Sequence, residues 1–203
     1  MKGFTVIGGV IVYSLIFISM TVAQTGKTRS ASSLKGKRVA ILAEDLYEDP
    51  ELWYPYYRLL EAGAQVRIIG PKAKVYESKH GFPVTAEAAA SDVSAADFDG
   101  IVVPGGFAPD KLRRYPAVLD LVRDIYKKGG VVAAICHGPW VPISAGIVKG
   151  KRATCFKAIK DDLVNAGATF LDQAVVVDDN LITSRTPADL PAFLPAIITA
   201  LGG

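Results

Sequence analysis

The 203-residue chain has few of the residues that build metal sites and disulfide frameworks. Two cysteines cannot form the framework of a small disulfide-stapled domain or a four-cysteine zinc site. The two histidines, His80 and His137, are far apart in the sequence and predict no metal site. A strand–GxGxxG–helix unit is also absent, so we expect neither a dinucleotide cofactor nor a metal.

Acidic residues are missing from the beginning of the chain. Residues 1–38 hold six of the 23 basic residues and no acidic one, so 17 basic and 20 acidic residues remain in 39–203. The net charge of +3 therefore hides a mildly acidic domain. A nucleic-acid-binding protein carries a basic patch on its folded part, and none is indicated, so we expect no nucleic-acid partner.

The N-terminal segment also lacks charge, because residues 3–24 contain no acidic or basic side chain. Residues 4–23 form a largely apolar run that is long enough to span a bilayer. Lys2 before the run and small residues up to Ala23 are equally typical of a signal peptide. Both alternatives predict a membrane-targeted protein, either exported or periplasmic after cleavage near Ala23, or anchored by residues 4–23 with its orientation open.

The composition divides the chain into three parts. Residues 1–23 are interpreted as the signal peptide or membrane anchor, and the small polar residues 24–36 as a flexible linker. Residues 37–203 form the expected globular domain, which is long enough to bury a sizeable core.

Strand and helix patterns alternate along the globular part. This order predicts an α/β fold, a three-layer sandwich with a mostly parallel sheet, whose ligands bind beyond the carboxyl ends of the strands. The expected strands cover residues 37–43, 65–69, 82–85, 101–103, 131–135, 174–177 and 181–183, and the expected helices residues 50–62, 116–128, 138–145, 161–166 and 189–201.

The segment VVAAICHGPW, residues 131–140, carries the strongest chemical signal. An apolar strand leads directly into Cys136, and a helix is expected just after it, which is the pattern of a nucleophile elbow. A thiol at a helix N-terminus is stabilised as the thiolate, so we expect a lowered pKa for Cys136. Adjacent side chains on a helix do not face each other, so His137 is not required to act as an in-line base. Cys155 is interpreted as structural.

Two further segments are predicted to lie near this thiol. In VVPGGFAPD, residues 102–110, Gly105 and Gly106 follow a strand and allow backbone N–H groups to form an oxyanion hole. EDLYEDPELWYP, residues 44–55, holds five acidic residues, most of which we assign to a solvated loop. One carboxyl group near the thiol would orient or protonate it, and burial would raise the pKa of that acid.

These motifs occur together and in order, and with them the domain resembles the ThiJ/PfpI superfamily, in its PfpI-like branch of intracellular proteases and deglycases. The resemblance covers nearly all of residues 37–203 and extends through ISAGIVKGKRAT, IKDDLVNAGA and VVVDDNLITSRTPADLPAF. It implies a flavodoxin-like α/β/α sandwich with a cysteine nucleophile at the elbow. It also implies a homodimer or a higher homo-oligomer.

The resemblance further implies roles for single residues. Cys136 matches the nucleophile, and Glu48, in YEDPEL, matches the acid that hydrogen-bonds its sulfur. The backbone N–H groups of Gly106 and His137 match the oxyanion donors. In PfpI-like proteases the histidine after the nucleophile, here His137, is completed by an acid of a neighbouring subunit, and Asp110 occupies that position.

Two aromatic residues depart from the family pattern. Phe107 stands where an arginine is common, and Phe156 where a tyrosine is common, so both remove polar groups near the pocket. We expect these departures to alter the choice of substrate.

Three functions use the same residues. The first is a cysteine hydrolase of the peptidase type, in which Cys136 forms an acyl-enzyme. The second is a glyoxalase or deglycase acting on methylglyoxal and glycated adducts, in which Cys136 adds to the aldehyde and Glu48 moves protons between carbons. The third is a non-enzymatic oxidative-stress sensor or chaperone, in which Cys136 is oxidised to a sulfinic acid. The expected substrate is accordingly a small aldehyde or a peptide.

Overall fold

A computed structural model of the chain describes residues 3 and 34–203. Contacts divide the chain into two units, residues 1–30 and residues 31–203, and the second unit is the domain considered below. The domain includes Leu34, which is buried and whose backbone N–H donates to the carbonyl of Ala62. Residues 34–36 were expected to belong to the linker, but the burial of Leu34 joins them to the domain.

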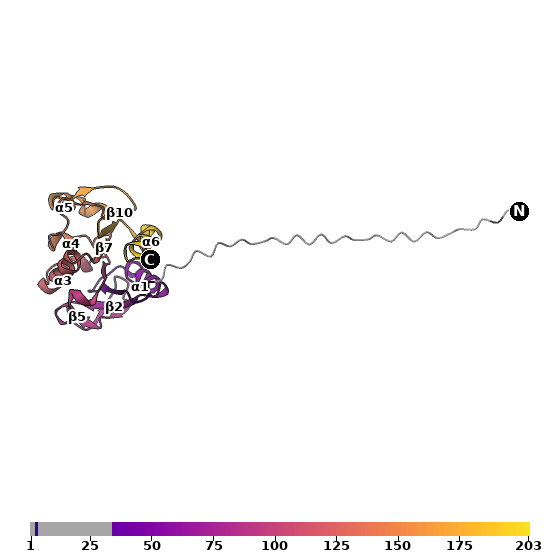
Figure 1. The fold of residues 1–203 in the computed structure, drawn as a ribbon, viewed down its shortest axis with the longest axis horizontal. Coiled ribbons are helices and arrows are strands. Elements are labelled where there is room, and N and C mark those ends of the chain that lie inside the picture. The colour runs from indigo at the N-terminus through magenta and orange to yellow at the C-terminus, as the bar shows by residue number, and fades with distance from the viewer. Residues whose placement is uncertain (1–2, 4–33) are drawn as a thin grey trace. The chain divides into compact units, whose positions relative to one another are not determined.

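A seven-stranded sheet forms the middle layer, in the order β10-β11-β7-β6-β1-β2-β5 (Figure 1). All its pairs are parallel except the hairpin of β10 and β11. The flavodoxin-like α/β fold is therefore confirmed. The strands are β1 (Arg38–Leu42), β2 (Gln65–Gly70), β5 (Ala88–Ala89), β6 (Gly100–Val103), β7 (Val131–Ile135), β10 (Val175–Asp178) and β11 (Leu181–Ser184).

Helices cover both faces of this sheet. Figure 1 shows α1 and α6 on one side of the sheet and α3 and α4 on the other. This arrangement explains why the central strands are apolar without alternation, since both of their faces are buried. The helices are α1 (Asp49–Glu61), α2 (Ala108–Leu112), α3 (Pro116–Lys127), α4 (Trp140–Ser144), α5 (Lys160–Asn165) and α6 (Leu190–Ala200).

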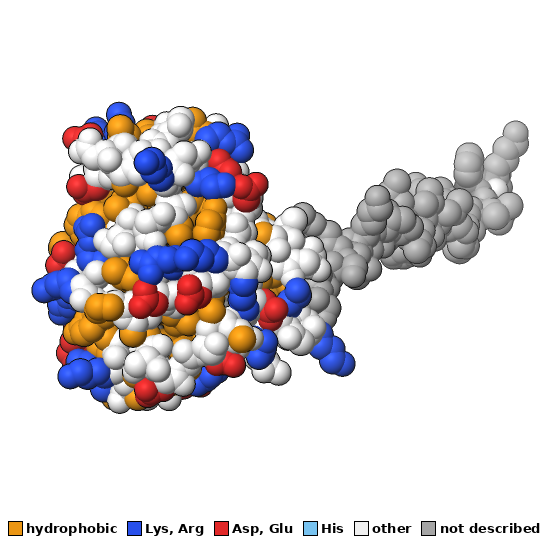
Figure 2. Space-filling model, turned by 60° about the vertical axis from the view of Figure 1, so that its left-hand side comes forward, with side chains coloured by type: hydrophobic (Ala, Val, Ile, Leu, Met, Phe, Trp, Pro, Cys, Tyr) orange, Lys and Arg blue, Asp and Glu red, His pale blue; other side chains and the backbone are white. Residues whose placement is uncertain are grey.

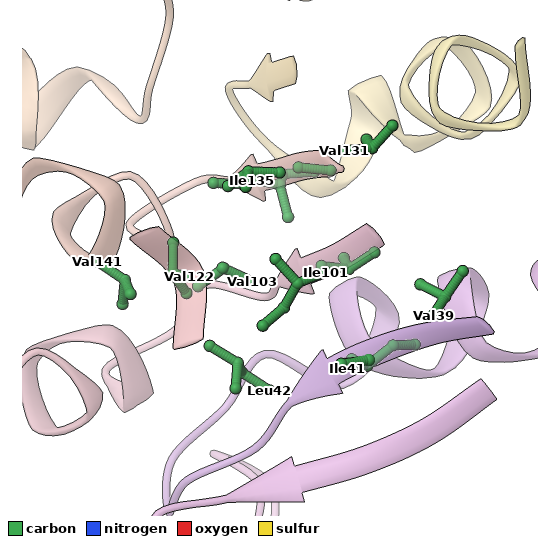
Figure 3. Packing of buried hydrophobic residues seen from close by; sticks show 14 of the residues in the cluster. Val39, Ile41, Leu42, Ile101, Val103, Val122, Val131, Ile135 and Val141 are labelled. Atoms are coloured by element: carbon green, nitrogen blue, oxygen red, sulfur yellow. The ribbon is translucent and has the colours of Figure 1, made fainter. Parts of the chain in front are cut away.

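The core lies between the sheet and the helices (Figure 3). Every residue of β7 is buried, and so is every residue of β6. In Figure 3, Val122 of α3 and Val141 of α4 lie beside Val103 of β6. This packing holds the carboxyl ends of β1, β6 and β7 in fixed positions, and the candidate site is built at those ends.

The predicted long elements are present, with ends shifted by a residue or two. The helix expected at residues 138–145 is shorter, because a turn separates Cys136 from α4. Sequence patterns did not indicate α2 or the short strands β3 (Val75–Glu77), β5, β8 (Arg152–Ala153) and β9 (Thr169–Phe170). Strand β3 pairs with β4 (Pro83–Thr85), which was predicted, and β8 pairs with β9. Segments of two to five residues are too short to show a period.

The prediction of a membrane-targeted protein is wrong. Within residue 3 and residues 34–203, no helix is long and apolar enough to cross a membrane. The predicted signal peptide or anchor at 1–23 and most of the predicted linker lie outside the described residues, apart from Gly3.

Candidate active site

Cys136 lies at a sharp turn directly after β7. Its backbone has φ of 61°, a left-handed conformation that is uncommon for a residue with a side chain. Its N–H donates to the carbonyl of Ser184, and its carbonyl accepts from the N–H of Phe156. These two bonds hold the strained turn in place, as is typical of residues that perform chemistry. The predicted nucleophile elbow is therefore present in the backbone geometry.

Glu51, on the buried face of α1, is the carboxyl group that lies against the thiol. Its side chain is fully buried, and Oε2 accepts a hydrogen bond of 2.7 Å from the N–H of Gly105. The other oxygen, Oε1, is buried and has no hydrogen-bond partner among the described residues. Burial raises the pKa of Glu51 to about 7, and the hydrogen bonds from the N–H of Gly105 and the thiol of Cys136 offset this only in part. The carboxyl group can therefore gain or lose a proton near neutral pH.

Glu48 has a different position from the one that the resemblance implied. It precedes α1 with an extended backbone, and its Oε2 lies 2.7 Å from the Nζ of Lys79. The charge of Glu51 affects the thiol more strongly than the charge of Glu48 does. Glu51, rather than Glu48, therefore makes the hydrogen bond to the thiol of Cys136 that the resemblance implied. One signal in the sequence indicates this: Glu51 shares an i, i+4, i+8 stripe with Pro55 and Leu59, which are also buried.

The backbone donors around the sulfur come from two loops. The N–H groups of Gly106 and His137 hydrogen-bond to the sulfur of Cys136 and lower its pKa. The N–H of Gly105 was expected to join them, but it is occupied by Glu51. A Cβ atom at Gly105 would lie 2.6 Å from Oε2 of Glu51 and 2.7 Å from Cβ of Cys136. Glycine at this position is what allows the carboxyl group and the cysteine to approach each other.

The sequence predicted a lowered pKa for the thiol of Cys136, and this prediction is wrong for the site without substrate. Burial, followed by the charge of Glu51, raises the pKa of Cys136 to about 12, and the two backbone donors do not compensate. The helix α4 contributes little, since it has five residues and begins at Trp140 rather than at the thiol. When Glu51 carries a proton its charge no longer opposes the thiolate. The ionisation of Cys136 therefore depends on the protonation state of Glu51.

His137 faces the thiol although it is the next residue in the chain. Its Nδ1 lies 3.3 Å from Sγ of Cys136, because the left-handed turn brings two successive side chains together. The imidazole packs on the rings of Phe156 and Trp140, with centroids 4.9 and 5.2 Å away. Burial and the charge of Lys79 lower the pKa of His137, so the ring is neutral near pH 7.

Lys79 is a site residue that the sequence analysis missed. It lies in the turn between β3 and β4, and its Nζ is 5.6 Å from the ring centroid of Phe107. The hydrogen bond to Glu48 raises the pKa of Lys79, and the negative charges of Cys136 and Glu51 raise it further. The ammonium group of Lys79 therefore interacts electrostatically with both Cys136 and Glu51. Of the hairpin that carries it, only β4 was predicted from the sequence, and β3 was not.

Replacing Lys79 by methionine is expected to slow alkylation of Cys136 by iodoacetamide at pH 7 severalfold, and at most about tenfold. Loss of the cation leaves the thiolate and Glu48 uncompensated, so the pKa of Cys136 rises. The pKa of His137, followed by NMR, should rise in the same variant because Lys79 lowers it. Lys127→Met, at an exposed position of α3, serves as the control. Unchanged values in Lys79→Met would contradict the assigned influence.

Asp110 does not meet His137 within the chain. It lies on α2, where Oδ2 is 2.8 Å from the guanidinium of Arg114, and its side chain is 57% exposed. In the part of the chain that the structure describes, no contact joins Asp110 to the imidazole of His137.

The described residues contain no group of three or more His, Cys, Asp or Glu side chains that could hold a metal ion.

A model of the DJ-1/PfpI family matches residues 37–200. The chain belongs to this family. A deglycase from Pyrococcus abyssi is 42% identical over 164 residues, which cover 81% of this chain and 99% of the relative. A Bacillus subtilis protein whose name provisionally assigns it to the cysteine proteases is 44% identical over 158 residues, covering 77% of this chain and 94% of the relative.

Solved structures agree with this assignment. A two-domain protein from Anabaena variabilis, with a DJ-1/ThiJ/PfpI-like and a ferritin-like domain, superposes with a TM-score of 0.80. It is 45% identical, and the match covers 82% of this chain and 48% of that protein. Together with the named relatives, the match places the chain among enzymes of the deglycase and cysteine-protease types.

Proposed function

We propose that this protein is a cysteine-dependent glyoxalase and deglycase that acts on methylglyoxal and on its adducts with amines. The observation that carries the proposal is the buried pair of Cys136 and Glu51. Glu51 has one oxygen held by Gly105 and the other unpartnered, and a pKa raised to about 7. A group of this kind beside a nucleophile suits reactions that move a proton between neighbouring carbons.

The first step forms a carbon–sulfur bond. Ionised Glu51 takes the thiol proton, and the thiolate adds to the aldehyde carbon of methylglyoxal. The electron pair of the carbonyl moves to oxygen, where the N–H groups of Gly106 and His137 stabilise the charge. Glu51 then returns its proton to that oxygen, which produces a hemithioacetal and restores the carboxylate.

The second step is an internal redox reaction that requires no external oxidant. Glu51 removes the proton from the former aldehyde carbon, and the resulting enediol is protonated on the neighbouring carbon. The aldehyde carbon is thereby oxidised to a thioester, while the ketone carbon is reduced to an alcohol. Water then cleaves the carbon–sulfur bond, so that methylglyoxal and water are converted into lactate and the thiol is regenerated.

An amine adduct enters the same path by displacement. In the adduct the aldehyde carbon bears a hydroxyl group and the amine nitrogen. Attack by Cys136 forms the carbon–sulfur bond, and the carbon–nitrogen bond breaks with transfer of a proton to the amine. The product is the same hemithioacetal together with the repaired amine.

A peptidase is the second candidate, and one distance favours it. Nδ1 of His137 lies 3.3 Å from Sγ, which is within reach for a base that activates a thiol. Against it, the imidazole has ring contacts but no carboxyl partner among the described residues of the chain. The family resemblance assigns that partner to Asp110 of a neighbouring subunit. Assembly into a homo-oligomer is part of this second proposal, and the exposure of Asp110 supports it.

The proposal is tested by incubating the purified protein with methylglyoxal and measuring lactate. We expect lactate to form, and Cys136→Ser to reduce its rate by at least about a thousandfold, because the nucleophile is lost. Cys155→Ser, at the other buried cysteine, is the matched control and should retain the rate. Absence of lactate from folded protein, with cleavage of peptide substrates that depends on Cys136, would establish the peptidase instead.

A further inference from the structure

A cavity of about 370 Å³ lies apart from the cysteine. Its walls come from the loop after β1, the loop between β2 and β3, and the segment from α2 to α3. None of Cys136, Glu51, His137 or Lys79 lines it. The cavity lies at the carboxyl ends of β1 and β2, and this edge of an α/β sheet is where ligands commonly bind.

The cavity has rigid walls because Tyr76 anchors them. Tyr76 is fully buried, and its hydroxyl group hydrogen-bonds to both the N–H and the carbonyl of Lys72 at 3.0 Å. A Cβ atom at Gly70 would lie 2.4 Å from the tyrosine ring, so the ring packs directly on the backbone. Lys74 lies over the same ring at 4.4 Å and pairs with Asp45 at 3.3 Å. The loop that carries Lys72 is thereby fixed to the sheet.

Glu44 provides a buried acidic group in this wall. It is only 5% exposed, and Oε1 accepts from the N–H of Asp45 at 2.9 Å. In the part of the chain that the structure describes, no lysine or arginine lies within ion-pair distance of Glu44. Burial raises the pKa of Tyr76 to about 12, and the charge of Glu44 adds to this shift. A buried carboxyl group without a cationic partner favours a ligand that supplies one.

Basic side chains line the same cavity. Lys74 and Arg114 already pair with Asp45 and Asp110. Lys72 and Lys111 also line the cavity, and neither side chain forms an ion pair with a described residue. The face drawn in Figure 2 carries charges of both signs interspersed. In this cavity, two lysines without ion-pair partners among the described residues line the same space as the buried Glu44.

We propose that this cavity binds a small α-amino acid in its zwitterionic form. The ammonium group of the ligand would pair with Glu44, and its carboxylate would lie between Lys72 and Lys111. A simple anion is disfavoured by Glu44, and a simple cation by the two lysines, whereas a zwitterion satisfies both. The site is independent of the reaction proposed for Cys136.

Isothermal titration of the purified protein with three related ligands tests the charge requirement. L-alanine carries both charges, N-acetyl-L-alanine lacks the ammonium group, and L-alaninamide lacks the carboxylate. We expect L-alanine to bind at least about tenfold more tightly than either analogue, because each analogue leaves one charged side of the cavity unpaired. Equal affinities of the three, or no binding of L-alanine in the millimolar range, would overturn the proposal.

Variants locate the binding within the cavity. Glu44→Gln and the double variant Lys72→Ala/Lys111→Ala are each expected to weaken L-alanine binding by about tenfold or more. Lys127→Ala, an exposed lysine of α3, should leave the affinity unchanged. Alkylation of Cys136 by iodoacetamide at the wild-type rate would show that the variants are folded. Wild-type affinity in the folded Glu44 and lysine variants would show that the binding lies elsewhere.

Discussion

Replacing Glu51 by glutamine is expected to lower kcat for lactate formation by at least about a hundredfold. Glutamine preserves the size of the side chain and still accepts from the N–H of Gly105 through its carbonyl oxygen. It cannot take a proton from a thiol or from a carbon, so the transfers assigned to Glu51 stop. Measurement of lactate under substrate saturation separates this loss of kcat from a change in binding.

Glu48→Gln is the matched control for this prediction. Glu48 is three residues away, has the same chemistry, and pairs with Lys79 rather than with Gly105. Its replacement removes one negative charge that raises the pKa of Cys136, so its effect on kcat should be far smaller. An equal loss in the two variants would contradict the assignment of proton transfer to Glu51.

The pH dependence of stability provides an independent test of the same residue. The pKa of Glu51 rises from 4.5 to about 7 on folding, so the folded protein binds this proton more tightly than the unfolded chain. The resulting stabilisation is complete below pH 4.5 and is lost as the pH rises through about 7, by up to about 1.4 kcal/mol per pH unit. Glu51→Gln should remove this slope from denaturant unfolding measured between pH 5 and 8. A variant with an unchanged slope would show that Glu51 does not titrate there.

Replacing Gly106 by alanine is expected to destabilise the domain by about 3 kcal/mol or more. Gly106 has φ of +75°, and a Cβ atom there would lie 2.4 Å from the carbonyl oxygen of Leu46 and 2.6 Å from the backbone nitrogen of Glu48. Both neighbours are backbone atoms of the loop that leads into α1, so they cannot move without displacing Glu51. The free energy of unfolding from denaturant titration measures the loss, and alkylation of Cys136 reports the damage to the site.

Gly129→Ala separates backbone strain from steric overlap. Gly129 has a similar φ of +85°, but a Cβ atom there would meet nothing within 4 Å. We therefore expect only the cost of the left-handed conformation, about 1–2 kcal/mol, and no effect on Cys136. A loss in Gly106→Ala no larger than in Gly129→Ala would show that the loop yields to the added carbon.

The positions of Cys136 and of the main strands could be predicted because they depend on local patterns. An apolar run such as residues 131–135 has few alternatives to a buried strand, and a cysteine directly after it must lie at the sheet edge where ligands bind. The family resemblance extended this prediction to the fold and to the class of enzyme. These conclusions needed no knowledge of which distant segments meet.

The acid partner could not be chosen with the same certainty, although its segment was identified. Glu48 and Glu51 lie in the same short motif, and their roles depend on where α1 begins and which of its faces is turned to the sheet. Lys79 was missed for a related reason, since its hairpin is fixed by contacts with the loop after β1, such as the bond from Lys79 N–H to the carbonyl of Tyr47. A contact between segments leaves no periodic trace in either of them.

By itself, the sequence determined an α/β sandwich, a cysteine at a strand-to-helix turn and a glycine loop beside it, because each is encoded in consecutive residues. Only the tertiary structure decided which carboxyl group faces the thiol, that His137 turns back towards it, and that the thiol pKa is raised. Those outcomes depend on burial and on charges brought together from distant segments, since desolvation and Coulomb interactions act across space rather than along the chain.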